Sequence, residues 1–143
     1  MAKTPIHLWI VGLLSLVWNA GGAVDYVMTK FQVAAYVEAL PEAALRMLEE
    51  APIWFGTSWA VGVWFSVIGS ILLLARSRLA AGAFALSFLG LVVSSVYTYG
   101  MSDGGSMMAT GGTAALVFTV AIPVILILLW FYARAMTRKG VLR

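Results

Sequence analysis

The sequence predicts an all-α polytopic membrane protein with four transmembrane helices, and three observations support that fold class. Of the 143 residues, 62% are hydrophobic and only 10% are charged, whereas soluble domains are about 45–50% apolar and about 25% charged. The mean hydropathy is +0.97. Four stretches are long enough to cross a hydrocarbon core of roughly 30 Å, which takes about 20 apolar residues. This composition excludes a disordered chain, a nucleic-acid-binding module and an ordinary soluble enzyme.

The four predicted spans leave too little chain for a soluble domain, so we expect a single bundle. No Lys, Arg, Asp or Glu lies in the middle third of any span. The first span has some features of a secretory signal, since Lys3 precedes it, but its apolar run is longer than that of a usual signal. In the fourth span, Pro123 is expected to kink the helix. The spans are predicted at residues 6–28, 53–75, 79–100 and 113–133.

The charged residues predict the orientation of the bundle. Four spans place both termini and the 76–78 turn on one side of the bilayer, and all nine basic residues except Lys30 and Arg46 fall there. The six acidic residues, Asp103 among them, all fall on the other side. The positive-inside rule therefore predicts that both termini are cytoplasmic. The net charge of +3 reflects this topology, so we expect no nucleic-acid partner.

An external segment, residues 29–52, separates the first two spans and is predicted to contain two short helices. Its apolar residues repeat at helical spacing, with charged residues on the other faces, and Pro41 suits the first turn of the second helix. The segment is either an amphipathic connector along the membrane surface or a lid or docking platform. The other external stretch, residues 101–112, carries four glycines and is predicted to be a flexible loop.

Small residues recur every four positions in the second and third spans. Such stripes let helix backbones approach closely in lipid, where the hydrophobic effect does not drive association. We therefore expect helix–helix seams, and the alternative is a narrow polar pathway. The predicted packing residues are Ser58, Gly62, Ser66 and Ser70 in the second span, and Gly90 and Ser94 in the third.

Asn19 and Asp25 are the polar residues of interest in the first span. Asn19 lies about 20 Å along the helix from Ile6, and its amide needs partners that lipid cannot supply. It therefore either joins two helices or contacts a ligand. Asp25 is the only carboxylate within a predicted span, about 28 Å from Ile6 and so near the outer interface. It either caps that helix end or takes part in coupling-ion or substrate chemistry.

Several tryptophans lie deeper in the spans than an interfacial aromatic belt explains. Indole faces beside an amide could hold a sugar or a flat apolar ligand, although packing against lipid is the commoner use of such residues. The predicted ligand-binding residues are Trp18, Asn19, Asp25, Tyr26, Trp59 and Trp64.

The residue inventory argues against catalysis and metal binding. The chain has no cysteine and a single histidine, which excludes disulfides, thiolate metal sites and a bis-histidine haem. The sequence contains no recognisable nucleophile–base pair or phosphate-binding loop, so we expect neither enzymatic activity nor a cofactor. A bound lipid, quinone or pigment leaves no sequence signature and stays open.

A pattern in the first span, WNxxGxxDY, provides a resemblance to a known family. It stands at Trp18, Asn19, Gly22, Asp25 and Tyr26. The chain resembles, over nearly its whole length, small four-span bacterial inner-membrane proteins commonly labelled sugar transporters. That resemblance implies a Gram-negative inner membrane and a transport function. Small multidrug exporters have a similar size but need a glutamate deep in the first span, and small three-span sugar permeases need a proline–glutamine motif that this chain lacks.

Two functions are consistent with the sequence. The first is a permease for a neutral polar solute such as a sugar, bound near Trp18, Asn19 and Trp59. It would act as a homo-oligomer, because four helices enclose little volume. The alternative is a non-catalytic accessory or assembly subunit of a larger membrane complex. The expected partners are the lipid bilayer and either further copies of the chain or other membrane subunits.

Overall fold

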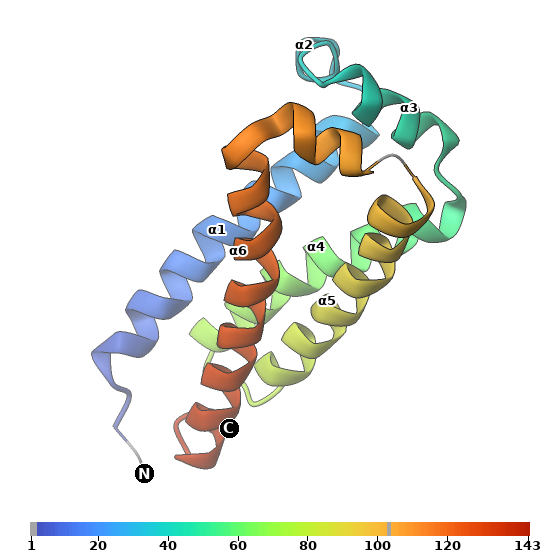
Figure 1. Ribbon diagram of the computed structural model, residues 1–143. Coiled ribbons are helices and arrows are strands. Elements are labelled where there is room, and N and C mark those ends of the chain that lie inside the picture. The colour runs from blue at the N-terminus through green and yellow to red at the C-terminus, as the bar shows by residue number, and fades with distance from the viewer. Residues whose placement is uncertain (1–2, 103) are drawn as a thin grey trace.

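Four long helices form the bundle, which confirms the predicted all-α fold with four helices able to span a membrane (Figure 1). The computed structural model describes residues 3–102 and 104–143, with the backbone alone over 104–110, and no strand occurs in these ranges. The long helices are α1 (Ile6–Lys30), α4 (Ile53–Leu74), α5 (Ala80–Ser95), which continues into the π-helix η1 (Val96–Met101), and α6 (Gly104–Arg138).

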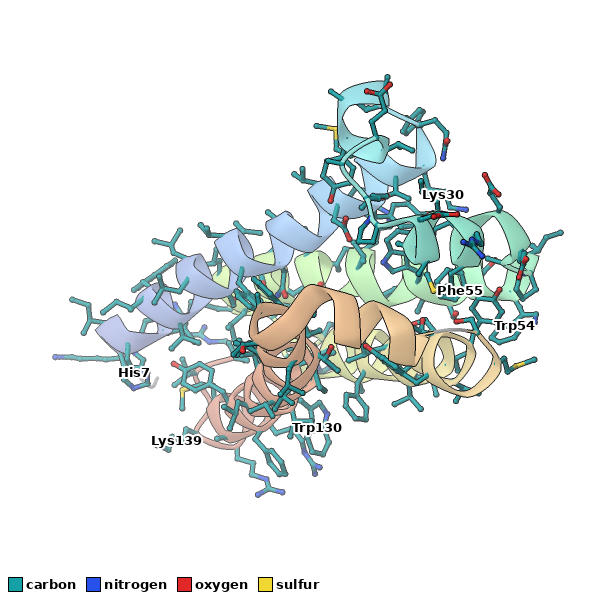
Figure 2. All side chains as sticks on the ribbon, turned by 45° about the horizontal axis from the view of Figure 1, so that its top comes forward. His7, Lys30, Trp54, Phe55, Trp130 and Lys139 are labelled. Atoms are coloured by element: carbon teal, nitrogen blue, oxygen red, sulfur yellow. The ribbon has the colours of Figure 1, made fainter. Side chains whose placement is uncertain are left out.

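The bundle has two chemically different ends, which we call the basic end and the acidic end. The start of α1, the turn between α4 and α5, and the end of α6 lie together at the basic end (Figure 1). The chain between α1 and α4, which carries four glutamates, lies at the acidic end (Figure 1). Figure 2 shows His7 and Lys139 toward the basic end and Lys30, Trp54 and Phe55 toward the acidic end.

The external segment folds, as predicted, into two short helices, α2 (Ala34–Val37) and α3 (Glu42–Glu50). Pro41 immediately precedes α3, where its missing N–H costs no intrahelical hydrogen bond. Met47 of α3 packs with Phe55 and Tyr97, and the Tyr97 hydroxyl donates to the Met47 carbonyl at 3.3 Å. These contacts attach α3 to α4 and η1.

Residues 101–112 differ from the predicted flexible loop, because α6 already begins at Gly104. The break in this helix falls at Gly112, with φ 61° and ψ −148°, a conformation that glycine adopts because it has no Cβ. The Met-Met-Ala run before the break favours helix. Pro123 lies within the helix, and the break in the helical backbone angles falls at Gly112. Asp103 lies outside the described residues.

Helices α4 and α5 cross with their backbones in close approach. A Cβ built on Gly90 would lie 2.5 Å from the Gly62 nitrogen and 2.6 Å from the Ser58 carbonyl oxygen. Across the same crossing, Ser87 Oγ donates to the Gly62 carbonyl at 2.5 Å. Backbone therefore lies directly on backbone here, which is how small residues let helices associate in lipid.

The main hydrophobic core fills the half of the bundle nearest the basic end. All four long helices contribute to it, together with the residues that follow α6. Its buried members are Leu8, Leu73, Ala80, Phe84, Leu126, Leu129, Ala133, Met136, Val141 and Leu142.

Residues 140–143, which we call the closing segment, cover the basic end of this core. Gly140 has φ 69° and ends α6 in the left-handed conformation that often terminates helices, with Val141 N–H donating to the Met136 carbonyl at 3.0 Å. Arg143 then pairs with the turn between α4 and α5: its N–H donates to the Arg76 carbonyl at 2.8 Å, and its carbonyl accepts from the Arg78 N–H at 3.0 Å. The segment thus ties α6 to the α4–α5 turn.

Candidate functional site

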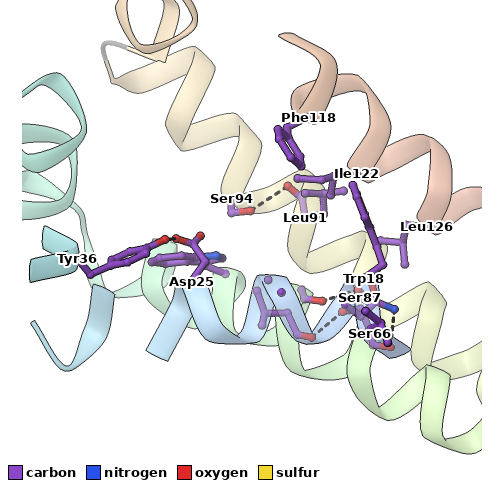
Figure 3. Close-up of a pocket in the computed structure, with 17 residues that line it drawn as sticks. Trp18, Asp25, Tyr36, Ser66, Ser87, Leu91, Ser94, Phe118, Ile122 and Leu126 are labelled. Carbon is purple, nitrogen blue, oxygen red and sulfur yellow. Dashed lines mark hydrogen bonds between the residues drawn. The ribbon is translucent and has the colours of Figure 1, made fainter. Parts of the chain in front are cut away.

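A cavity of about 810 Å³ lies between α1, α4, α5 and α6 in the half of the bundle nearest the acidic end (Figure 3). It adjoins the main core at Leu126, which belongs to both. At its other end it reaches Asp25 of α1 and Tyr36 of α2. The residues that line it are Val17, Trp18, Asn19, Gly21, Gly22, Asp25, Tyr36, Trp59, Gly62, Val63, Ser66, Ser87, Leu91, Ser94, Phe118, Ile122 and Leu126.

Aromatic rings close the side of the cavity between α1 and α6. The Trp18 indole of α1 stacks on the Phe118 ring of α6, with ring centroids 6.0 Å apart and planes inclined by 17°. The close backbone packing of these helices is elsewhere, since α1 packs on α4 and α6 packs on α5. The gap between α1 and α6 is therefore bridged by large side chains and not by backbone contact.

Asn19 is buried, and its amide nitrogen is committed to α4. Nδ2 donates to the Ser66 carbonyl at 3.1 Å and to Ser70 Oγ at 2.9 Å. Ser15 Oγ donates to the same Ser70 hydroxyl at 3.0 Å. The amide therefore links α1 to α4, and its Oδ1 has no hydrogen bond to any residue in the described ranges. Asn19 can thus join helices and still offer an acceptor to a ligand, which combines the two roles considered from the sequence.

The serine hydroxyls around the cavity donate their protons to nearby carbonyls. Ser66 Oγ donates to the Val63 carbonyl at 2.7 Å, and Ser94 Oγ donates to the Leu91 carbonyl at 3.0 Å. Ser87 Oγ donates across the α4–α5 crossing as described above. A hydroxyl whose proton is used in this way retains only acceptor lone pairs. These polar groups of the cavity therefore suit a ligand that brings hydrogen-bond donors.

Asp25 and Tyr36 form the end of the cavity nearest α2 (Figure 3). The Tyr36 hydroxyl donates to Asp25 Oδ1, joining α2 to α1. This hydrogen bond raises the pKa of Tyr36 from its ordinary value of 10.0 to about 12, with smaller contributions from burial and from the negative charge of Asp25. The only ion pair in the described ranges joins Arg46 to Glu42, so Asp25 has no cationic partner there.

We expect the tyrosinate titration to reveal the Tyr36–Asp25 hydrogen bond. A raised pKa means that folding favours the protonated phenol, so this contribution to stability is present below pH 10 and is lost as the pH rises toward 12. Tyrosinate formation is followed by near-ultraviolet absorbance as the pH is raised, in the wild type and in Tyr36→Phe. The difference between the two curves is the titration of Tyr36, and its midpoint should lie at about pH 12. A midpoint near pH 10 would mean that the phenol is free of Asp25.

The structure brings together some of the predicted ligand-binding residues but not all. Trp18, Asn19, Asp25 and Trp59 line the cavity. Tyr26 lies behind Trp59, with ring centroids 4.9 Å apart in an edge-to-face arrangement, and Trp64 is 41% exposed on the outside of the bundle. Neither Tyr26 nor Trp64 lines the cavity.

Several lining residues were not singled out from the sequence. Tyr36 is eleven positions from Asp25, and only the reversal of the chain after α1 brings the two side chains together. The aliphatic lining of α5 and α6 carries no signal that distinguishes a cavity wall from a lipid-facing surface. Gly62, Ser66 and Ser94, predicted as packing residues with a narrow polar pathway as the alternative, also border the cavity.

No group of three or more His, Cys, Asp or Glu residues able to hold a metal ion occurs in the part of the chain that the structure describes. No family model, curated protein or solved structure matches this chain. The chemistry of the cavity therefore provides the basis for a functional proposal, and the resemblance based on WNxxGxxDY stays a prediction.

Proposed function

We propose that the protein is a non-catalytic, small-molecule-binding protein of a bacterial inner membrane, with both termini in the cytoplasm and the ligand in the cavity between α1, α4, α5 and α6. The observation that carries this proposal is the cavity itself. Its volume of about 810 Å³ falls within the range of roughly 300–1,000 Å³ that small-molecule sites occupy. The cavity also has the usual lining of such a site, mainly apolar and aromatic with a few polar groups.

The lining favours an amphiphilic ligand over a freely soluble one. Trp18, Phe118 and Trp59 offer apolar and aromatic surface, while the polar groups are confined to Asn19, Asp25, Tyr36 and three serines. A ligand with an apolar body and one or two hydrogen-bond donors would match both parts.

The resemblance implies transport, which would make the protein a permease for a neutral polar solute such as a sugar. Such a permease would act as a homo-oligomer, because four helices enclose little volume. The cavity extends toward the acidic end, while the main core and the closing segment fill the basic end. A transport cycle would therefore need to open the basic end as well. Sugar uptake by reconstituted vesicles tests the permease, and uptake unchanged by Asn19→Leu would remove Asn19 from its site.

Ligand occupancy of the cavity can be tested with an uncharged photoreactive alkyl glucoside in lipid nanodiscs. We expect mass spectrometry to find labelled peptides around residues 17–25 and 59–66, and we expect Gly22→Phe to abolish this labelling by filling the cavity from α1. Apart from its chain neighbours and its own helix backbone, no atom lies within 4 Å of a Cβ built on Gly22, and Gly22 lines the cavity, so the added side chain starts in open space.

Gly82→Phe is the matched control for that experiment. A Cβ on Gly82 also meets nothing within 4 Å, but Gly82 does not line the cavity, so labelling should persist. Labelling of the same peptides to the same extent in both variants would contradict the proposal.

The second candidate is an accessory or assembly subunit of a larger membrane complex, and the exposure of α6 favours it. Only 11% of the apolar window in the span Gly111–Arg138 is buried within the bundle. That helix therefore offers a long apolar face to lipid or to another membrane subunit. Purification from native membranes in mild detergent, followed by identification of every co-purifying polypeptide, tests this candidate. A homo-oligomer without any other chain would count against it.

A further inference from the structure

We propose that the cavity binds a lipophilic cation, meaning an organic molecule with one positive charge and an aromatic or branched apolar body. Its charge would lie at Asp25 and its apolar body would lie among Trp18, Trp59 and Phe118. This inference rests on the proposed small-molecule binding and deepens it by naming the class of ligand.

The charge balance of the lining is the first step of the argument. Asp25 is the only residue with a formal charge among those that line the cavity, and no Lys, Arg or His is present there. Lys30, on the same helix, borders a neighbouring pocket with Thr29 and Gly56, on the other side of Trp59, which lines both. A cation in the cavity would therefore meet a carboxylate and no like charge, whereas an anion would meet no counter-charge.

The availability of the carboxylate is the second step. One oxygen of Asp25 accepts from the Tyr36 hydroxyl, which fixes the direction of the carboxylate without neutralising its charge. Arg46 is already paired with Glu42, so that side chain does not compete for Asp25. A bound cation would supply the ionic partner that the described residues do not provide.

The aromatic rings are the third step. An indole face attracts a cation through its quadrupole, and tryptophan does so more strongly than phenylalanine or tyrosine. Trp18 and Trp59 approach the cavity from two different helices, and Phe118 extends the aromatic wall by stacking on Trp18. The apolar body of a lipophilic cation can thus contact rings on more than one side.

The charges around the cavity favour the same ligand. The external segment carries Glu38, Glu42, Glu49 and Glu50 against only Lys30 and Arg46, so the acidic end has a net negative charge. Such a field raises the local concentration of cations and speeds their association.

The test compares two ions of nearly equal size and opposite charge, tetraphenylphosphonium and tetraphenylborate. Equilibrium dialysis would measure their binding to the protein in nanodiscs of zwitterionic lipid, with empty nanodiscs subtracted. We expect the cation to bind saturably and the anion to bind at least about tenfold more weakly. The neutral alkyl glucoside should displace the cation, and Gly22→Phe should abolish its binding. Asp25→Asn should weaken cation binding by about tenfold, while Glu38→Gln, which removes one charge from the external segment but none from the cavity, should weaken it far less.

Asp25→Glu guards against a variant that fails to fold, because it keeps the charge and should keep the preference for the cation. Equal binding of both ions, or cation binding that Asp25→Asn leaves unchanged, would overturn the assignment of a cationic ligand. Small-molecule binding at the cavity would still stand if Gly22→Phe abolished labelling by the neutral glucoside. If that labelling and the binding of both ions were insensitive to Gly22→Phe, the proposed function itself would fail.

Discussion

Gly90→Ala should destabilise the bundle by about 1–3 kcal/mol, the range that overpacking of a tight contact costs. The added methyl would lie 2.5 Å from the Gly62 nitrogen and 2.6 Å from the Ser58 carbonyl oxygen. Both are backbone atoms, so no side-chain rotation can relieve the overlap, and α4 and α5 would have to separate. Separation would also stretch the hydrogen bond from Ser87 Oγ to the Gly62 carbonyl.

Gly82→Ala is the matched control, because it adds the same methyl to the same helix at a position where nothing lies within 4 Å. Gly62→Ala should fall between the two, since its nearest neighbour would be the Leu91 nitrogen at 3.3 Å. Unfolding in mixed micelles with increasing dodecyl sulfate, followed by circular dichroism, measures the order. Equal unfolding midpoints for Gly90→Ala and Gly82→Ala would refute this crossing of α4 and α5.

Removal of residues 141–143 should cost about 2–4 kcal/mol and open the basic end of the bundle. Val141 and Leu142 are buried in the main core, and the two backbone hydrogen bonds of Arg143 attach this segment to the α4–α5 turn. Without them, the core around Ala133, which is now completely buried, would face the medium.

The absence of cysteine from the chain makes this opening measurable with a single reporter thiol. Ala133→Cys should resist a membrane-impermeant maleimide in the full chain and react once residues 141–143 are removed. Arg143→Ala provides the control, because the backbone hydrogen bonds of Arg143 survive the loss of its exposed side chain. A thiol that stays unreactive after the truncation would show that the closing segment does not seal the core.

The fold was predictable from the sequence because span number depends on length and hydropathy, which are local properties. The two short helices of the external segment were predictable for a similar reason, since Pro41 and the apolar periodicity act within a few residues. The helix before Gly112 was not predicted, because four glycines suggest a loop while the residues between them favour helix. Only Gly112 takes a left-handed φ within α6.

The candidate site was predictable only in part. The need of Asn19 for a partner follows from its predicted depth in the membrane, but the identity of that partner depends on the register of α1 against α4. That register is set by packing between segments distant in sequence. Phe118 and Leu126 could not have been assigned to the cavity, because an apolar side chain is equally compatible with lipid, a core or a ligand.

The stacking of Trp18 on Phe118 determines how fast molecules could exchange between the cavity and the surrounding lipid. The two rings bridge α1 and α6, and Phe118 is 55% exposed. Exposed side chains change rotamer in picoseconds to nanoseconds, whereas helices move against one another in microseconds to milliseconds. Phe118 can therefore turn on the faster timescale, and if the partly buried Trp18 turns with it, the gap opens without a movement of the helices. A ligand would then exchange between the cavity and the membrane many times before any motion of the helices opened the basic end.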